Sequence, residues 1–295
     1  MKEIVVISGK GGTGKTSLVA AFACLADRPV LADCDVDAAD LYLVLEPHIL
    51  RQEDFSGGKQ AKIISERCDG CGICMEVCRF DAVKKDIHPD NPGQMKYIID
   101  PIACEGCGVC VYFCPQKAID FDPPINGKWF ISDTRVGPMV HARLGIAEEN
   151  SGKLVTLVRS EARRIAEENG HPYLLVDGPP GIGCPVIASI TGADLVVVVT
   201  EPTVSGEHDL DRVHKLSSHF GVPTVVCINK HDINPEVTER IFEESRKNDM
   251  PVVGKIRYDN SFTKAQIMKS SVIEYTHGPV VEDVKETWAG ILGAL

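Results

Sequence analysis

The glycine-rich segment GKGGTGKT at Gly9–Thr16 constrains the fold more than any other part of the sequence. It fits G-x4-G-K-[ST], follows a strand-like run at Glu3–Ser8 and precedes a predicted helix at Thr16–Ala26. Glycines let main-chain N–H groups close around phosphate oxygens, and the positive end of the helix adds to that attraction. The segment therefore predicts a phosphate-binding loop in which Lys15 reaches the β- and γ-phosphates and Thr16 binds Mg²⁺.

Alternating strand and helix signals extend this unit into a larger domain. The predicted strands are Glu3–Ser8, Pro29–Asp33, Tyr173–Asp177, Asp194–Thr200, Pro223–Asn229 and Pro251–Ile256. The predicted helices are Thr16–Ala26, Leu154–Asn169, His208–His219 and Pro235–Lys247. The strand segments are β-branched and apolar on both faces, which is typical of a parallel sheet covered by helices. We therefore predict an α/β, doubly wound, mostly parallel P-loop NTPase domain.

The pattern breaks after about Leu50. Residues 51–125 are richer in Gly, Cys, Asp and Pro than the flanking chain. They contain two half-repeats whose first cysteines, Cys68 and Cys104, are 36 positions apart. Each half predicts a strand, a cysteine loop, a short helix and a second strand, so a small unit has been duplicated.

This break predicts a domain inside a domain. We expect a small α+β, bacterial-ferredoxin-like domain at residues 56–125, inserted into a P-loop ATPase domain formed by 1–55 and 126–295. The segment Asn126–Val155 returns the chain to the main sheet, and its own structure is not assigned. Short cysteine-dense units build little core, so bound clusters are expected to hold the insert together.

The spacing C-x2-C-x2-C-x3-C occurs twice, followed by Arg79 in the first run and by Pro115 in the second. In bacterial two-cluster ferredoxins with this spacing, the fourth cysteine ligates the other cluster. By that rule one [4Fe-4S] cluster is bound by Cys68, Cys71, Cys74 and Cys114, and the other is bound by Cys78, Cys104, Cys107 and Cys110. Four thiolates in eleven residues favour iron–sulfur cubanes over zinc, and a purely structural role for such clusters stays open.

Charge and hydropathy limit the expected partners. The net charge of −11 argues against a nucleic-acid footprint or a polybasic membrane patch. No apolar run approaches the ~18 residues of a membrane span, and MKEIVVIS leads into a strand-like run rather than a signal peptide. We therefore expect a cytoplasmic protein without nucleic-acid or membrane partners, whose cysteines bind metal rather than form disulfides.

Lys10 makes the glycine loop more specific, because GKGG places a second lysine directly after the first glycine. The loop resembles the deviant Walker A motif of the MinD/ParA/Mrp superfamily of SIMIBI-class ATPases, which includes the nitrogenase iron protein. The resemblance implies ATP or ADP and Mg²⁺ as ligands, and catalytic roles for Lys10, Lys15 and Asp35. It implies that Lys10 reaches across a nucleotide-sandwich dimer to neutralise transition-state charge on the partner's nucleotide. The implied nucleotide-binding residues are Gly9, Lys10, Gly11, Gly12, Thr13, Gly14, Lys15, Thr16, Ser17, Asn229, Arg257 and Tyr258.

The resemblance continues at the predicted metal site. In LADCDVDAADL, Asp35 takes the position of the water-orienting aspartate, with Asp33 near the metal. In LLVDGPPGIG, Asp177 takes the position of the Walker B aspartate that holds Mg²⁺ through water. The implied magnesium site therefore consists of Thr16, Asp35 and Asp177.

Two further segments resemble base-binding loops. CINKHD places Asn229 against the base, but it also fits the N-K-x-D pattern of GTPases. ATP and GTP therefore both stay open on this motif, although the deviant Walker A favours ATP. GKIRYDNSF resembles the loop that closes over adenine, which makes Arg257 and Tyr258 candidate base contacts.

Cys184 lies seven residues after Asp177, the offset at which the nitrogenase iron protein places a ligand of its dimer-bridging cluster. That protein's second cysteine has no counterpart here. Cys184 is therefore interpreted either as a bridging-metal ligand or as a plain cysteine at a dimer interface.

Together the motifs predict an ATP-binding and ATP-hydrolysing dimeric iron–sulfur protein. Its nucleotide state is expected to control electron transfer through two [4Fe-4S] clusters to a partner protein, in an orange-protein-type system for example. The second subunit is expected to be another copy or a paralogous ATPase. Two alternatives stay open: a metallochaperone ATPase that carries or matures a cluster, and a redox-sensing, nucleotide-dependent binding module.

Overall fold

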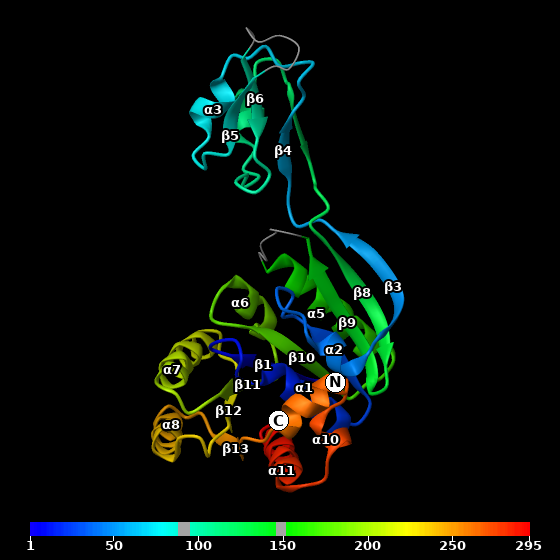
Figure 1. The fold of residues 1–295 in the computed structure, drawn as a ribbon, viewed down its shortest axis with the longest axis vertical. Coiled ribbons are helices and arrows are strands. Elements are labelled where there is room, and N and C mark those ends of the chain that lie inside the picture. The colour runs from blue at the N-terminus through cyan, green and yellow to red at the C-terminus, as the bar shows by residue number, and fades with distance from the viewer. Residues whose placement is uncertain (88–94, 146–151) are drawn as a thin grey trace. The chain divides into compact units, whose positions relative to one another are not determined.

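A computed structural model describes residues 1–87, 95–145 and 152–295 of the chain. Its internal contacts divide the chain into two compact units. Unit 1 consists of Met1–Glu53, Trp129–Leu144 and the described part of Asn150–Leu295. Unit 2 consists of the described residues of Asp54–Lys128 and Gly145–Glu149. The elements of both units are labelled in Figure 1.

Unit 1 is built on a nine-stranded sheet. In their order across the sheet, the strands are β13 (Val252–Ile256), β12 (Thr224–Asn229), β11 (Leu195–Thr200), β1 (Lys2–Ser8), β10 (Tyr173–Pro180), β2 (Pro29–Asp33), β9 (Gly137–Leu144), β8 (Gly127–Thr134) and β3 (His48–Phe55). Pairing is parallel from β13 through β9. The predicted mostly parallel α/β sheet is confirmed.

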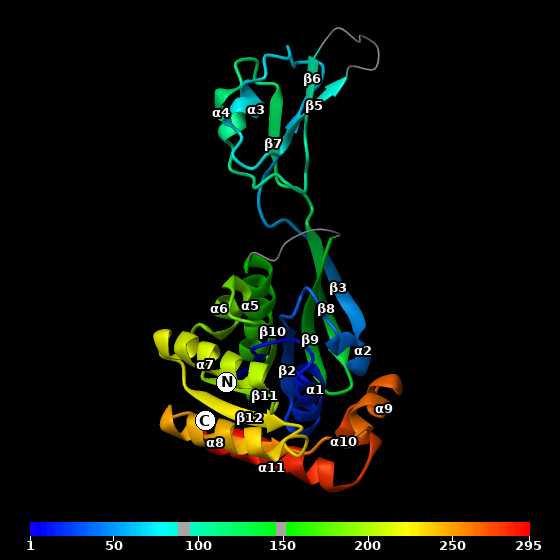
Figure 2. The same ribbon diagram turned by 60° about the vertical axis from the view of Figure 1, so that its left-hand side comes forward.

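Helices cover both faces of this sheet, as Figures 1 and 2 show. The helices on one face are α1 (Lys15–Leu25), α2 (Leu41–Leu45), α9 (Ser261–Ile267), α10 (Val272–Tyr275) and α11 (Pro279–Gly293). The helices on the other face are α5 (Lys153–Glu168), α6 (Cys184–Ile190), α7 (Val204–His219) and α8 (Pro235–Lys247). None of the helices in the described ranges is both long and apolar enough to cross a bilayer.

Burial of β-branched residues explains the central strands. Every residue of β11 (LVVVVT) is buried, and only the first residue of β1 (KEIVVIS) is exposed. The two helical layers remove the apolar side chains on both faces of such strands from water. Burial of each Val or Ile stabilises the folded state by about 1.5–3 kcal/mol. On one face, Phe22 of α1 stacks on Trp288 of α11 with ring centroids 5.6 Å apart.

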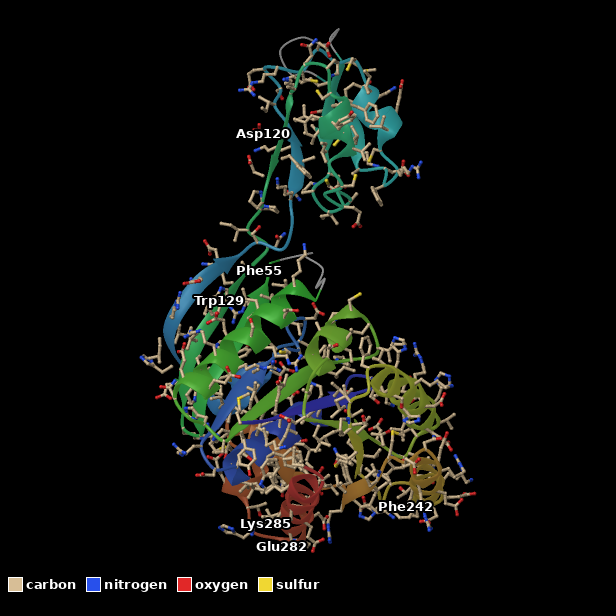
Figure 3. The ribbon with its side chains drawn as sticks, turned by 180° about the vertical axis from the view of Figure 1, so that it is seen from behind. Phe55, Asp120, Trp129, Phe242, Glu282 and Lys285 are labelled. Atoms are coloured by element: carbon tan, nitrogen blue, oxygen red, sulfur yellow. The ribbon has the colours of Figure 1, made fainter. Side chains whose placement is uncertain are left out.

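Charged side chains pack around this core. Glu3 of β1 is buried and is bound by the guanidinium groups of Arg159 and Arg163 from α5. At the edge strand β13, the Lys255 ammonium group lies 4.4 Å from the ring centroid of Phe242 in α8, whose side chain is labelled in Figure 3. These contacts fix α5 to the central strand β1 and α8 to β13.

Three strands were not predicted from the sequence. β9 pairs with β2, and β8 and β3 extend the sheet to its edge. On β8 the Trp129 side chain, labelled in Figure 3, is buried, and the Arg51 guanidinium of β3 lies 5.7 Å from its ring centroid. The segment left unassigned at Asn126–Val155 therefore contributes two strands of the main sheet.

Unit 2 contains two antiparallel strand pairs and two short helices. The strands are β4 (Gln60–Ile63) paired with β7 (Ile119–Asp122), and β5 (Val83–Ile87) paired with β6 (Met95–Ile99). The helices are α3 (Ile73–Val77) and α4 (Val109–Phe113). Each half-repeat therefore has the predicted order of strand, helix and strand, and β4 of the first half pairs with β7 of the second. The core includes Ala61, Cys74, Val83, Tyr97 and Ile119, so it is small.

Candidate functional site

A cleft lies in unit 1 at the carboxyl ends of the parallel strands, where open α/β sheets bind their ligands. It encloses about 1180 Å³ of empty space, part of it open to solvent. Of the predicted nucleotide and magnesium residues, those in its lining are Gly11, Gly12, Thr13, Gly14, Lys15, Thr16, Ser17, Asp35, Asn229, Arg257 and Tyr258. Gly9, Lys10 and Asp177 are outside that lining. The sequence motifs from four separate segments are thus brought to one cleft.

Lys15 lies buried at the floor of this cleft. Its Nζ donates to Asp177 Oδ1 at 2.6 Å and to Asp35 Oδ2 at 3.2 Å. Burial lowers the pKa of Lys15, but the carboxylates of Asp177 and Asp35 more than offset this, and the pKa is raised. The lysine therefore carries its charge and is held between the two predicted magnesium residues.

A third carboxyl group adds to this cluster. The sheet register places Asp33 of β2 directly beside Asp177 of β10. Burial, followed by the Asp177 charge, raises the pKa of Asp33 well above its usual range, and burial also raises the pKa of Asp35. β10 continues to Pro180, so Asp177 lies within its strand rather than at the predicted strand end.

One oxygen of this cluster is suited to a cation. Asp177 Oδ2 is buried without a hydrogen-bond donor among the described residues. A buried carboxylate oxygen without a partner is costly, and a hard cation with oxygen ligands removes that cost. Thr16 lies in the same lining at the start of α1.

Lys10 points away from the cleft of its own chain. Its Nζ forms an ion pair with Glu201 Oε1 at 2.7 Å and donates to Ser205 Oγ at 2.8 Å and Thr203 Oγ1 at 3.2 Å. These partners lie at the end of β11 and the start of α7. Glu201 Oε2 also binds Lys230 Nζ at 3.0 Å, so one carboxylate bridges two lysines.

Asn229 and Lys230 bind the phosphate loop itself. Asn229 Nδ2 donates to the carbonyl of Thr13 at 2.7 Å, and Lys230 Nζ donates to the carbonyl of Gly12 at 3.3 Å. Gly14 has φ of 87°, and a Cβ there would lie 2.5 Å from Asn229 Nδ2. A glycine is therefore required at this position both for the backbone and for the close approach of the amide.

Two cavities in unit 2 are lined by cysteines. One has about 330 Å³ of empty space, part of it open to solvent, and the cysteines in its lining are Cys68, Cys71, Cys74 and Cys114. The other has about 360 Å³, also partly open to solvent, and the cysteines in its lining are Cys78, Cys104, Cys107 and Cys110. Each cavity therefore takes three cysteines from one half-repeat and the fourth from the other.

Backbone geometry is constrained near the first of these cavities. Gly70 has φ of 76°, and a Cβ there would meet the carbonyl oxygen of Met95. The Ala118 N–H lies 3.3 Å from Cys114 Sγ and donates to it, as donors near metal-bound thiolates do. Among the described residues, no three His, Cys, Asp or Glu side chains converge as the ligands of a single metal ion must.

The remaining cysteines differ in accessibility. Cys184 is exposed at the first residue of α6. Burial raises the pKa of Cys34 well above its usual range, and it raises that of Cys227 to about 12 and that of Cys24 to about 11. These three thiols are therefore poor nucleophiles, and Cys184 is the accessible one of the four.

Sequence reasoning missed several residues that shape the cleft. Glu201, which bridges Lys10 and Lys230, has no motif of its own. Its position directly after a buried parallel strand was the available signal, because ligand sites gather at such strand ends. Asp232 has no signal in the sequence beyond the N-K-x-D pattern. Its carboxylate accepts the Tyr258 main-chain N–H and does not line the cleft.

The fold and the cleft define a P-loop nucleotide-binding protein with a mostly parallel sheet. The chain belongs to the CobQ/CobB/MinD/ParA nucleotide binding domain family, whose family model matches residues 4–272. It is 33% identical over 242 residues to the uncharacterized protein MJ0578 of Methanocaldococcus jannaschii, covering 79% of each chain. It is 26% identical over 239 residues to MJ0579 of the same organism, covering 79% of this chain and 82% of that one.

Solved structures with the same fold include two archaeal MinD proteins. The cell division ATPase MinD of Pyrococcus furiosus superposes with a TM-score of 0.57 at 15% identity, covering 100% of this chain and 99% of that one. MinD of Pyrococcus horikoshii, solved in complex with Mg-ADP, gives 0.58 at 14% identity, covering 98% and 95%. At these identities the likeness concerns the fold.

Proposed function

We propose that the protein is a dimeric ATPase that carries two [4Fe-4S] clusters and uses its nucleotide state to control electron transfer to a partner protein. The observation that carries the proposal is the pair of cysteine cavities. The cross-over ligand rule divides the eight cysteines into two sets of four, and each cavity is lined by one complete set. A P-loop cleft in unit 1 of the same chain supports the nucleotide half of the proposal.

The cysteine spacing favours clusters over single zinc ions. Four thiolates occur within eleven residues, twice over, and each cavity is lined by four cysteines. Cys68, Cys71, Cys74 and Cys114 would hold one cluster, and Cys78, Cys104, Cys107 and Cys110 the other. When bound, such clusters accept and release single electrons at potentials set by nearby charges, hydrogen bonds and exposure. The Ala118 N–H bond to Cys114 Sγ is one such hydrogen bond.

The cleft supports roles for individual side chains. Lys15 is placed to exchange its carboxylate partners for the phosphates of ATP. Thr16, Asp177 and one oxygen of Asp35 would then hold Mg²⁺, and the other oxygen of Asp35 would orient the attacking water. The complex of P. horikoshii MinD with Mg-ADP and the ATP-binding description of the related M. jannaschii protein MJ0547 support this choice of ligands.

Dimer formation is proposed from Lys10. Its ammonium group lies outside the cleft lining of its own chain and is bound to Glu201, so it would leave that carboxylate to reach a nucleotide bound by a second subunit. That subunit is a second copy or a paralogue, and M. jannaschii contains at least two relatives of this chain. Transition-state charge on the transferred phosphoryl group would then be neutralised in trans.

The test is anaerobic purification followed by metal analysis and EPR. We expect iron and acid-labile sulfide in equal amounts, and a reduced spectrum that changes when ATP and Mg²⁺ are added. Cys114→Ser and Cys78→Ser each remove one ligand from a different cavity, so each is expected to lose about half of the iron. Iron-free protein would contradict the cluster assignment, and a spectrum indifferent to ATP would contradict the coupling.

A second candidate function rests on Cys184. Its thiol is exposed at the start of α6, and α6 packs on β10, the strand that contains Asp177. An accessible thiol close in sequence to the nucleotide site suits a maturation factor that holds a transferable cluster. Transfer of ⁵⁵Fe to an apo-ferredoxin that is lost in Cys184→Ser supports this candidate, and unchanged transfer excludes it.

A further inference from the structure

The polar side chains of the N-K-x-D sequence in this chain are hydrogen-bonded to protein groups, and Asp232 lies outside the lining of the cleft. Asn229 and Lys230 donate to the carbonyls of Thr13 and Gly12 in the phosphate loop. Asp232 Oδ1 accepts the main-chain N–H of Tyr258 at 2.7 Å. Asp232 is also outside the lining of the cleft, although Lys230 and Tyr258 are part of it.

Each residue of the loop that Asp232 binds, Arg257–Asp259, forms a hydrogen bond through its side chain or its main chain. The Arg257 side chain binds Asp283 of α11 with Nε–Oδ2 and Nη2–Oδ1 distances of 2.6 and 2.8 Å, and the Arg257 N–H donates to Oδ2 at 3.1 Å. Asp259 Oδ1 accepts the N–H of Ser261 at 2.7 Å. Between these contacts, the bond to Asp232 fixes the middle residue, Tyr258. The three residues of this loop, Arg257–Asp259, all line the cleft.

This arrangement bears on base selection. Guanine presents its N2 amino group and its N1–H as donors, so a site that selects it needs a free carboxylate facing the base. The carboxylate that would serve in an N-K-x-D motif binds the Tyr258 N–H through Oδ1 and does not line the cleft. The Tyr258 side chain is 53% exposed and gives the cleft a flat aromatic surface for a base.

We propose that Asp232 is a positioning residue: it fixes the loop Arg257–Asp259 as one wall of an adenine site and does not read the base. This inference rests on the proposed nucleotide binding and concerns which base the cleft selects. Asp232 positions the loop by accepting the Tyr258 N–H, and it affects the nucleotide only through that residue.

The experiment compares Asp232→Asn with Asp232→Ala on the full chain. The Asn side-chain oxygen still accepts the Tyr258 N–H, whereas Ala removes the acceptor. Dissociation constants are measured by calorimetry with Mg²⁺ for ATP, GTP, xanthosine triphosphate and inorganic tripolyphosphate, the last of which lacks a base. Asp211→Ala, on the exposed face of α7 where Asp211 binds Lys215, is the matched control.

We expect Asp232→Asn and the control to bind ATP within about threefold of the wild type, and Asp232→Ala to bind it about tenfold more weakly. Tripolyphosphate affinity is expected to be the same in all four proteins, because the phosphate loop is untouched. Wild-type preference for GTP, or ATP affinity unchanged in Asp232→Ala, overturns the inference. Equal loss of ATP and tripolyphosphate affinity in Asp232→Ala also overturns it.

Xanthosine triphosphate gives the sharpest outcome. Where a carboxylate binds guanine, its replacement by Asn changes the preferred base to xanthine. Xanthine presents an acceptor where guanine presents a donor, and the Asn amide can donate to it. Tight xanthosine triphosphate binding by Asp232→Asn, or by Asp259→Asn, whose carboxyl group lines the cleft, contradicts an adenine site. If no nucleotide binds to the wild type, the proposed function itself fails, which is distinguishable from these results.

Discussion

Replacing Glu201 by Gln tests whether the ion pair between Lys10 and Glu201 within one subunit opposes dimer formation. The Glu201 carboxylate binds Lys10 at 2.7 Å and Lys230 at 3.0 Å, and its side chain is 15% exposed. Burial raises the pKa of Glu201, but the bonds from Lys10 and Lys230 bring it below its usual value. Each subunit must break the Lys10 ion pair before that lysine can enter the partner's site.

The expected magnitude follows from this geometry. Lys10 is partly exposed, so its ion pair contributes about 0.5–1 kcal/mol. The hydrogen bonds to Thr203 and Ser205 are present in both proteins and cancel in the comparison. Because two subunits each release one lysine, Glu201→Gln is expected to favour the ATP dimer by about 1–2 kcal/mol, which is about 5- to 30-fold in the dimer dissociation constant.

Sedimentation velocity with a non-hydrolysable ATP analogue measures that constant. The matched control is Glu207→Gln, because Glu207 also forms an ion pair at the start of α7 but binds Arg240 instead of Lys10. The control is expected to leave the dimer constant unchanged. A dimer dissociation constant in Glu201→Gln that is equal to or higher than that of the wild type would refute the idea that this carboxylate holds Lys10 away from the partner subunit.

Three further changes test other parts of the structure. Lys10→Ala is expected to abolish dimer-dependent ATP hydrolysis in a phosphate-release assay while nucleotide affinity is kept; unchanged turnover would remove the trans role. Burial raises the pKa of Asp33 above the model-peptide value of 3.8, so the folded nucleotide-free protein binds this proton more tightly than the unfolded chain does. The free energy of unfolding of the wild type, relative to that of Asp33→Asn, should therefore fall as pH rises above 3.8. Urea unfolding at several pH values measures this difference, and a difference that increased with pH would contradict the raised pKa. Leu175→Ala, at a residue 1% exposed in β10, should cost about 2–5 kcal/mol in the same unfolding assay, and a loss below 1 kcal/mol would show that the core refills the space.

Local signals were sufficient for the central strands and the phosphate loop. Runs such as LVVVVT are apolar on both faces, which a parallel sheet between helices requires, and they were placed to within a few residues. α7 begins at Val204, four residues before the predicted start, because the Thr203 side chain caps it by accepting the Gly206 N–H at 3.0 Å.

Edge strands and tertiary partners could not be predicted in the same way. β3 (HILRQEDF) is exposed over most of its length, so it has no apolar run to mark it. The bridge from Glu201 to Lys10 and the bond from Asp232 to Tyr258 join residues far apart in the sequence, and neither has a periodic signal. Four cysteines line each of the two cavities in unit 2, and their role as cluster ligands stays a prediction.

The neighbouring positions of β3 and β8 in the sheet have a consequence for insertion and deletion. Residues 56–126 connect these two neighbouring strands. The Asn126 N–H donates to the Phe55 carbonyl at 2.8 Å, so the two ends of this connection are held together. Loop-closure entropy grows slowly with length once the ends are fixed, so residues can be added to or removed from the connection at little cost to the stability of the nine-stranded sheet.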